Sequence, residues 1–494
     1  MNRTFLIGIL LAFAGIAKVS AQTNEEENSL VYRGEVFATA ASDHTPFWLV
    51  SNRYGLVPLE AGNGYLRAGL FYNHTFGKGF RWDAGFDIAA ITPRYRNVMV
   101  QQAYAELGYK SLLLTVGSKE QYISLWDEQL SSGDMVLSNN ARPIPEIKLS
   151  IPSYTVVPHT KGWLQLKGDF NIGRSFDNAY LESFVNERQT YVKDVLWHHK
   201  SLYFNIKDTR NHFPLSFEFG LQHGAQWGGT STNPSIGKQP QSLSDFVRVV
   251  FGMSGGEGST ASDSINVLGN EYGSYDFRLS FTKSNWAAHA YHQRYFEDKS
   301  GTEFLNGHDG LWGFQLDLPE FSWLQKIVVE LLETRNQTGS FHFIGFDHQA
   351  HPGIGGGADN YYNNGEYTTG LSYFNRGLGS PLITSPEYNK DGSLGFKNTR
   401  THNLHFGMSG DLSTQVGYRL LFTSMEGWGQ PYAPFLNKKE GLSGLCEISY
   451  QHHKLHGWVF TGMLSADKGD YYTKGIGGGL RITKRGILPI NRKQ

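Results

Sequence analysis

The chain has 494 residues, of which 44 are Lys or Arg and 45 are Asp or Glu, so its formal net charge is -1. This balance argues against nucleic acid as a partner. Charged residues make up only 18% of the chain, below the share in a usual soluble domain, and aromatic residues make up 14%. Such a composition is typical of a barrel in which alternate strand residues face lipid, while the lumen and the loops stay polar.

The N-terminus predicts a secretory signal peptide over residues 1–21. Arg3 supplies the positive charge, an apolar run follows over Phe5–Ile16, and Val19–Ala21 resembles a cleavage site. A membrane anchor is the alternative, but the apolar run is short for a span of about 20 residues. The polar residues 22–31 are expected to be flexible. Because no later stretch approaches about 18 uninterrupted apolar residues, the exported chain is expected to be a secreted β-protein or a membrane barrel.

Residues 32–484 are predicted to form the barrel, because strand-like alternation recurs along this range. In Val98–Gly117, apolar and polar residues alternate with the period of two that is typical of a β-strand. Lys110 and Ser111 interrupt the pattern and predict the turn of an antiparallel hairpin. The predicted lipid-facing residues are Ala103, Ala105, Leu107, Leu112, Leu114 and Val116, and the predicted lumen-facing residues are Gln102, Tyr104 and Glu106.

The connections between these runs differ greatly in length. Their asymmetry predicts an all-β fold, a transmembrane antiparallel β-barrel of about 18 strands with short periplasmic turns and long extracellular loops. The alternation is lost over 172–222 and 376–400, and each region is expected to contain a strand. The last strand is expected to stop near Thr483, which leaves 485–494 as a basic tail. Short connections are predicted near 77–79, 110–111, 283–285, 410–413 and 452–453, and long ones near 225–270, 297–309, 335–366, 425–441 and 465–473.

Residues 120–160 contain several prolines and lack a sustained period of two, which predicts an inserted segment that fills or caps the lumen. The prolines force Arg142–Pro145 into extended backbone. Arg142 is expected to pair with a lumen carboxylate and to pin the segment. The alternative is that its planar donor fork holds a carboxylate or a sugar hydroxyl of a ligand.

Two blocks of sequence resemble the capsule assembly Wzi family. They are ATAASDHTPFWLVSNRYG at 38–55 and LSSGDMVLSNNARPIPEIKLSIPSY at 130–154. The resemblance implies an outer-membrane barrel of about 18 strands, without catalytic activity, that acts as a lectin-like factor in attaching or assembling capsular or other surface polysaccharide. The family prototype has a small periplasmic helical element, for which Tyr180–Leu196 is the best candidate here, in competition with a strand. The family residues expected to be structural are Trp48, Arg53, Asn139, Arg142, Pro143 and Pro145.

Glycan binding has a clear physical basis in the predicted long loops. Sugar C–H faces stack on Trp and Tyr, and sugar hydroxyls bond to Asp and Asn. Each of these residues is also ordinary in loops, so their clustering supports this class of function rather than any single position. The candidate glycan-binding residues are Asp359, Asn360, Tyr361, Tyr362, Trp428, Tyr432, Tyr471 and Tyr472.

Other functions find weaker support in the sequence. No G-x-S-x-G motif or phosphate-binding loop is present, and no catalytic residue, metal or cofactor is expected. The loop residues His342, Asp347, His348 and His351 have side chains that bind ions, with a solvated loop as the alternative. Nothing in the sequence demands an oligomer, so a monomer surrounded by outer-membrane lipid and lipopolysaccharide is expected. The main alternative function is a passive channel for small solutes, for which polar residues such as Asp87 would line a wet lumen; a barrel enzyme acting on lipid or glycan is the third hypothesis.

Overall fold

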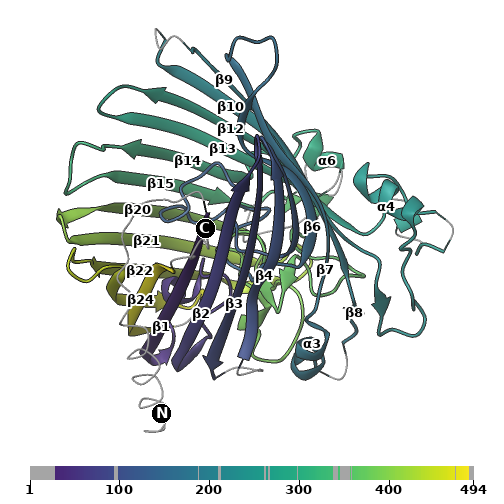
Figure 1. The fold of residues 1–494 in the computed structure, drawn as a ribbon. Coiled ribbons are helices and arrows are strands. Elements are labelled where there is room, and N and C mark those ends of the chain that lie inside the picture. The colour runs from purple at the N-terminus through teal and green to yellow at the C-terminus, as the bar shows by residue number, and fades with distance from the viewer. Residues whose placement is uncertain are drawn as a thin grey trace.

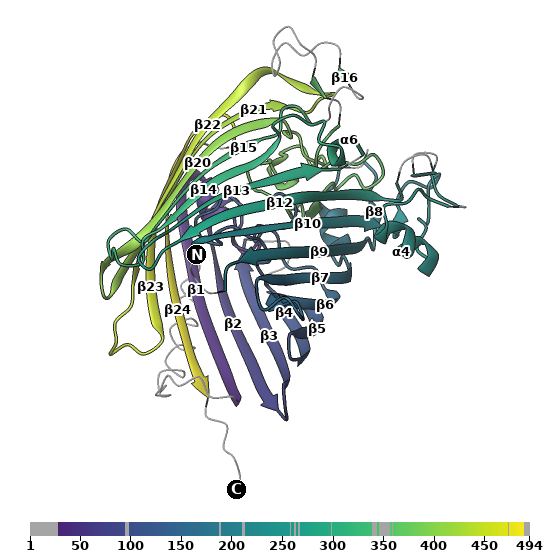
Figure 2. The ribbon, with the colours of Figure 1, turned by 90° about the horizontal axis from the view of Figure 1, so that it is seen from above.

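A closed, 18-stranded antiparallel sheet forms the body of the molecule (Figures 1 and 2). The sheet closes because its first strand pairs both with the second strand and with the last. This finding confirms the predicted barrel. The structure is a computed structural model that describes residues 28–93, 98–186, 189–209, 213–256, 258–260, 263–264, 267–297, 299–337, 343–344, 356–357, 359–472 and 474–488. The predicted signal peptide and the loop residues His342, Asp347, His348 and His351 lie outside the described residues.

The wall strands are β1 (Asn28–His44), β2 (Glu60–Phe76), β3 (Phe80–Thr92), β4 (Val98–Tyr109), β5 (Leu112–Ser118), β6 (Glu146–Val156), β7 (Leu164–Arg174), β9 (Leu196–Lys207), β10 (Leu215–Trp227), β12 (Asn270–Thr282), β13 (Ala287–Phe296), β14 (Gly310–Asp317), β15 (Lys326–Glu333), β20 (Thr401–Ser413), β21 (Val416–Gly429), β22 (Pro434–Tyr450), β23 (Trp458–Gly469) and β24 (Gly475–Leu488). The first strand thus begins before Tyr32, and the last one continues past Thr483. Pairing of β1 with β24 extends to Leu30 and Leu488, which holds both strand ends in the wall.

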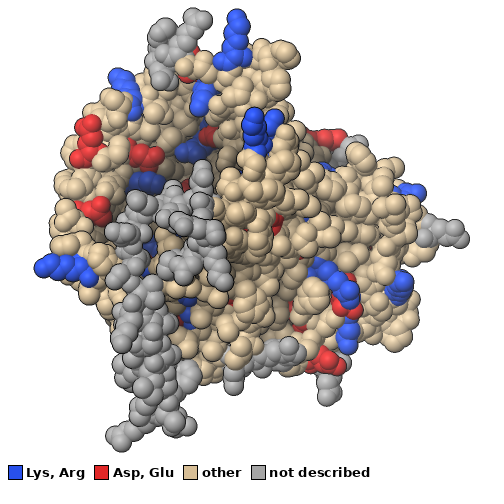
Figure 3. Space-filling model, in the orientation of Figure 1, with Lys and Arg blue, Asp and Glu red and all other residues tan. Residues whose placement is uncertain are grey.

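The β4–β5 hairpin shows how the wall is built. The strands meet at Lys110 and Ser111, as predicted. Leu107 is 51% exposed on the outer face, whereas its neighbour Glu106 is 6% exposed and points into the lumen. Alternation along a strand sends neighbours to opposite faces, so the exposed apolar side chains form the surface that meets lipid. Figure 3 shows a wide uncharged area on the outside of the wall, with charged residues gathered toward its borders.

The two ends of the barrel differ. At one end, short turns such as 77–79 and 414–415 join the strands; we call it the short-turn end. At the other, the long-loop end, connections such as 228–269 and 334–400 are long. The predicted long loop at 425–441 is wrong, because β21 and β22 extend as a hairpin and leave only 430–433 between them.

The smaller elements lie in the long connections. None of the helices in the described part of the chain is long and apolar enough to span a membrane. The candidate helix within Tyr180–Leu196 is only partly found, since α3 ends at Phe184 and β9 starts at Leu196. The helical elements are α2 (Phe47–Val50), α3 (Asn178–Phe184), α4 (Leu243–Val250), α6 (Lys299–Thr302) and η2 (Pro386–Tyr388), and the short strands are β8 (Val192–Lys193), β11 (Thr230–Ser231), β16 (Phe343–Ile344), β17 (Gly356–Gly357), β18 (Ser372–Tyr373) and β19 (Arg376–Gly377).

Three connections from the long-loop end fold into the barrel and fill its lumen. We call 45–59, 119–145 and 359–400 the lumen segments; their buried side chains form one core with the inner face of the wall. Two predicted boundaries are therefore wrong. The insertion predicted over 120–160 ends before Glu146, because β6 is a wall strand whose apolar residues alternate from Ile147 onward. The strand expected within 376–400 is absent from the wall, because these residues belong to a lumen segment.

Candidate functional site

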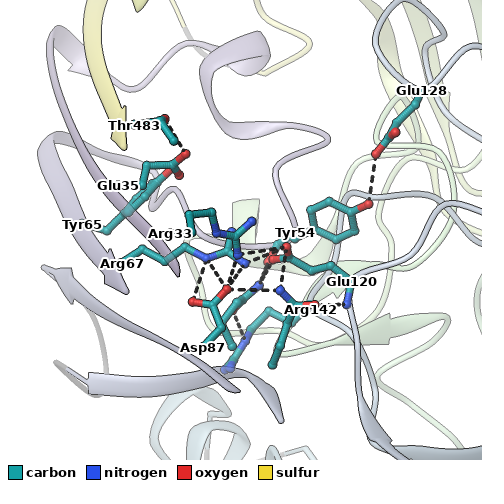
Figure 4. Close-up of polar contacts among 12 residues, drawn as sticks. Arg33, Glu35, Tyr54, Tyr65, Arg67, Asp87, Glu120, Glu128, Arg142 and Thr483 are labelled. Atoms are coloured by element: carbon teal, nitrogen blue, oxygen red, sulfur yellow. Dashed lines mark hydrogen bonds and ion pairs between the residues drawn. The ribbon is translucent and has the colours of Figure 1, made fainter. Parts of the chain in front are cut away.

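Charged residues of the wall anchor the lumen segments (Figure 4). Arg67 of β2 donates from Nε to Asp87 of β3 at 3.0 Å, and its Nη2 lies 2.7 Å from Glu120 of the second lumen segment. Arg33 of β1 also pairs with Asp87. A buried carboxylate is stable only where such partners neutralise it. Asp87 therefore faces the lumen as predicted, but it is enclosed by cations and does not line a wet channel.

Two glutamates anchor the segments farther round the wall. Glu330 of β15 accepts hydrogen bonds from the backbone N–H and the hydroxyl of Ser132, at 2.7 and 2.6 Å. Glu447 of β22 pairs with Arg53 of the first lumen segment at 3.3 Å and with Arg419 of β21 at 2.7 Å. Burial lowers the pKa of Arg53 to about 10, so this guanidinium remains charged at neutral pH.

Arg142 pins its segment in a different way from the one expected. Its Nη2 donates to the backbone oxygen of Val100 at 2.6 Å, its Nε to Gln101 at 3.3 Å, and its guanidinium lies over the ring of Phe374. The predicted pairing with a lumen carboxylate is therefore wrong. One backbone carbonyl, one side-chain amide oxygen and a ring face satisfy this buried cation, and its low exposure leaves no room for a surface sugar.

The other residues of the family-like blocks contact the wall or a neighbouring segment. Trp48 donates from Nε1 to Thr423 of β21 at 3.0 Å. The carbonyl of Asn139 accepts from the Tyr54 N–H at 2.7 Å, which joins two lumen segments. The carbonyls of Pro143 and Pro145 accept from Ser118 and from the Arg174 N–H, at 3.0 and 3.1 Å.

Four candidate glycan residues, 359–362, lie in a lumen segment rather than in an external loop. Tyr361 and Tyr362 are fully buried, and their hydroxyls donate to the carbonyls of Gln337 and Met135. Asn360 accepts from the Thr399 hydroxyl at 3.1 Å, and Asp359 is half-buried. A fully buried ring has no free face for a sugar, so the prediction of Tyr361 and Tyr362 as surface contacts is wrong.

The remaining candidates lie at the long-loop end. Trp428 is buried, with the guanidinium of Arg335 over its ring at 5.1 Å. Tyr432 is 70% exposed at the tip of the β21–β22 hairpin. Tyr471 and Tyr472 follow β23, and their rings lie 4.9 Å apart. The structure therefore separates these residues into a buried anchor, an exposed tip and a tyrosine pair.

The tyrosine pair lines a cleft of about 680 Å³ that opens at the long-loop end. Tyr472 packs 4.5 Å from Phe47 and 4.9 Å from Tyr388 of η2, measured between ring centroids. Burial raises the pKa of Tyr388 and Tyr472 well above its usual value, so both phenols stay neutral. The cleft is lined by Asp43, His44, Leu59, Glu60, Ala61, Thr384, Glu387, Tyr388, Asn389, Lys390, Lys397, Asn398, Phe435, Lys439, Tyr471 and Tyr472.

Charges of both signs surround this cleft. Lys397 donates to Asp391 at 2.8 Å, and this hydrogen bond lowers the pKa of Asp391. Lys390 is exposed and has no carboxylate partner among the described residues, and the Lys439 ammonium lies 4.4 Å above the Phe435 ring. Cations, amides and aromatic rings around one open cleft suit a polar ligand with apolar faces and negative groups.

Sequence reasoning found Tyr471 and Tyr472 but missed the rest of the cleft. Phe435 and Lys439 belong to β22, where the sequence predicts a long loop. The segment 385–392, SPEYNKDG, was assigned to a region expected to hold a strand, although its density of turn formers is a signal against one. Within the described residues, no group of His, Cys, Asp or Glu has an arrangement that would hold a metal ion.

Comparisons with known proteins agree with this architecture. The family described as "Capsule assembly protein Wzi" matches residues 13–383. The fold is similar to that of Wzi from Escherichia coli, described as an outer membrane protein involved in group 1 capsule assembly and a carbohydrate binding β-barrel. The TM-score is 0.57 and the identity 13%, over 93% of this chain and 84% of that chain.

Two further solved structures match with lower TM-scores. OccK2 of Pseudomonas aeruginosa, solved in complex with glucuronate, matches with a TM-score of 0.48 and 10% identity, over 95% of this chain and 100% of its own. OccAB4 of Acinetobacter baumannii matches with a TM-score of 0.46 and 9% identity, over 94% of this chain and 99% of its own. No curated protein matches the sequence. The family match covers well over half of the chain and, together with the closed wall and its apolar outer face, shows that this protein is an outer-membrane β-barrel of the capsule assembly protein Wzi family.

Proposed function

We propose that this barrel binds surface polysaccharide, without catalysing a reaction, and thereby helps to attach or assemble the capsule. The long-loop end would face the cell exterior, because outer-membrane barrels keep their short turns in the periplasm. The observation that carries the proposal is the open cleft at this end, where Tyr388, Tyr472 and Phe435 line a space of about 680 Å³.

The chemistry of the cleft suits a carbohydrate. Sugar rings present C–H faces that pack on aromatic side chains, and their hydroxyls bond to amides such as Asn389 and Asn398. Lys390 and Lys439 would attract the carboxylates or phosphates of an acidic polysaccharide. The carbohydrate binding described for the similar Escherichia coli barrel supports this assignment.

A passive channel, the alternative function, receives less support. Three lumen segments fill the barrel, and ion pairs and hydrogen bonds tie them to the wall, as at Glu120, Ser132 and Arg53. A diffusion channel needs a continuous water-filled path. The anchored segments therefore favour a binding role.

Reversing charge in the cleft tests the proposal. A strain that lacks the gene would receive either the wild-type protein or the double variant Lys390→Glu/Lys439→Glu, and cell-bound and shed capsule would be measured. We expect the double variant to shed several times more capsule than the wild type. Purified double variant should also bind the isolated polysaccharide at least tenfold more weakly.

The matched control is Lys454→Glu, an exposed lysine in the turn between β22 and β23 at the opposite end. This variant makes a charge reversal of the same kind away from the cleft, and it should behave as the wild type. Equal capsule retention and equal affinity in the double variant, at wild-type protein levels, would refute the cleft as the binding site.

A further inference from the structure

The apolar band on the outside of the barrel is too short on one side. On β4, outward-facing apolar residues run from Tyr109 to Val98, which corresponds to about 36 Å along the strand. On β9 the band runs only from Ile206 to Leu202, about 13 Å. Even without strand tilt, this is less than the band of about 25 Å that an outer-membrane barrel presents to lipid.

Polar residues occupy the outward positions where the band should continue. Beyond Leu202, the next outward positions of β9 are Lys200 and His198. Neighbouring strands contribute His223, whose Nε2 lies 3.3 Å from the carboxylate of Glu271. Charged and polar groups of this kind are costly in direct contact with lipid.

Helix α4 covers these polar groups from outside the wall. Phe246 lies 5.5 Å from the His198 ring, and Val249 packs in one cluster with Trp227 of β10. The Lys200 ammonium donates to the carbonyl of Val250 at the end of the helix. Figure 2 shows α4 at the outer edge of the molecule, beside the ends of β9 and β10.

A second apolar face of α4 has no cover. Leu243 and Phe251 are 79% and 73% exposed, and Val247 between them is also exposed. Positions four apart lie on one side of a helix, so these three residues form a stripe. The polar residues Ser244, Asp245 and Arg248 occupy the adjoining side of the helix, with Ser244 bordering the stripe, so α4 has the form of an interfacial amphipathic helix.

We propose that α4 is embedded in the outer leaflet and completes the lipid-contacting band over β7, β9 and β10, with Leu243, Val247 and Phe251 against lipid acyl chains. The helix continues an existing lipid surface, because Phe246 packs 6.1 Å from Phe170, an exposed residue of the outer wall. A capping box at its start, in which Ser242 and Asp245 exchange hydrogen bonds, stabilises the first turn of the helix.

Spin labels test this proposal on the full-length protein in phosphatidylcholine vesicles. With the single native cysteine removed as Cys446→Ser, a nitroxide would be attached at Val247→Cys, and its collision rates with oxygen and with a water-soluble nickel chelate would be measured. Oxygen concentrates in lipid and the chelate in water. We expect the ratio of the two rates at 247 to be at least fivefold higher than at Arg248→Cys, which lies about 100° farther round the same helix on its polar side.

Leu202→Cys, on the lipid-facing wall, supplies the reference value for lipid contact. Retention of the folded mobility on unheated gels would show that every variant forms a barrel. A ratio at 247 equal to that at 248 would overturn the proposal, since the stripe would then lie in water. Low collision rates with both reagents at 247 would also overturn it, because a second copy or another protein would then cover the stripe.

Discussion

Glu330 of the wall accepts a hydrogen bond of 2.7 Å from the backbone N–H of Ser132, which lies 198 residues earlier in the chain. The hydroxyls of Ser131 and Tyr291 donate to the same carboxylate, at 2.7 and 2.6 Å. One side chain thus satisfies several donors of a lumen segment. The fixed position of this segment depends on such contacts because it forms little secondary structure of its own.

Glu330→Ala should weaken the attachment of the lumen segment 119–145 to the wall. Removing the carboxylate leaves buried donors unsatisfied and should lower the free energy of unfolding by about 2–4 kcal/mol. In planar bilayers we expect the wild type to conduct rarely and the variant to open often. Glu426→Ala, which removes a partly exposed carboxylate at the rim, is the control. A Glu330→Ala variant that conducts as rarely as the wild type and has the same free energy of unfolding would show that Glu330 does not hold the segment.

Leu114→Arg tests the lipid-facing assignment of the β4–β5 hairpin. Leu114 is exposed on the outer face, and an arginine near the bilayer midplane should cost about 2–4 kcal/mol and reduce assembly in the membrane. Leu436→Arg is the matched control, because Leu436 is the most exposed leucine of the β21–β22 hairpin, beyond the wall. Folding into lipid vesicles followed by gel mobility would measure both. Equal assembly of the two variants would contradict the assignment.

The wall could be predicted from sequence where one face meets lipid and the other meets the lumen. Leu107 and Glu106 show this contrast directly. The pattern fails over β9 for a physical reason: His198 and Lys200 point outward but lie under α4, so polar residues occupy both faces. The missing alternation thus marks the place where a helix replaces the wall as outer surface.

The lumen segments could not be predicted in the same way. Tyr361 and Tyr362 belong to a run of Asp, Asn and Tyr that has the composition of an exposed loop. Only closure of the barrel places them among Met135 and Glu297, where their polar groups find buried partners. The tyrosines of the cleft have the same composition signal, so sequence alone does not separate Tyr472 from Tyr361.

Asp177 predicts a pH dependence at the junction of α3 with the third lumen segment. It accepts from the Phe374 N–H at 3.1 Å, and burial raises its pKa from 3.8 to about 6. Between about pH 4 and pH 6 the folded state therefore holds a proton that the unfolded state has lost, so this carboxyl makes stability fall as pH rises. Asp177→Asn keeps an acceptor without the charge and should stabilise the protein at pH 7.5 by up to about 3 kcal/mol.

Thermal unfolding of the wild type and Asp177→Asn at pH 4, 6 and 7.5 would measure the effect. The advantage of the variant should be small at pH 4 and should grow to its full size above pH 6. Asp391→Asn serves as the control, because Lys397 lowers the pKa of that exposed carboxyl. Loss of the Asp391 charge should slightly lower the stability at pH 7.5, whereas Asp177→Asn should raise it. If the stabilities of Asp177→Asn and the wild type changed with pH in parallel, the raised pKa of Asp177 would be contradicted.

Substitution of two aromatic residues of the β21–β22 hairpin distinguishes sugar binding in the cleft from sugar binding at the hairpin tip. Phe435 lines the cleft beneath Lys439, whereas Tyr432 is exposed outside it. If sugars bind in the cleft, Phe435→Ala should weaken polysaccharide binding about fivefold, equivalent to about 1 kcal/mol of lost stacking. Tyr432→Ala should change it little, because an exposed ring at the tip contacts no other part of the site. Titration of the purified variants with isolated capsule polysaccharide measures both affinities. If Tyr432→Ala had the larger effect, the sugar would bind at the hairpin tip and not in the cleft.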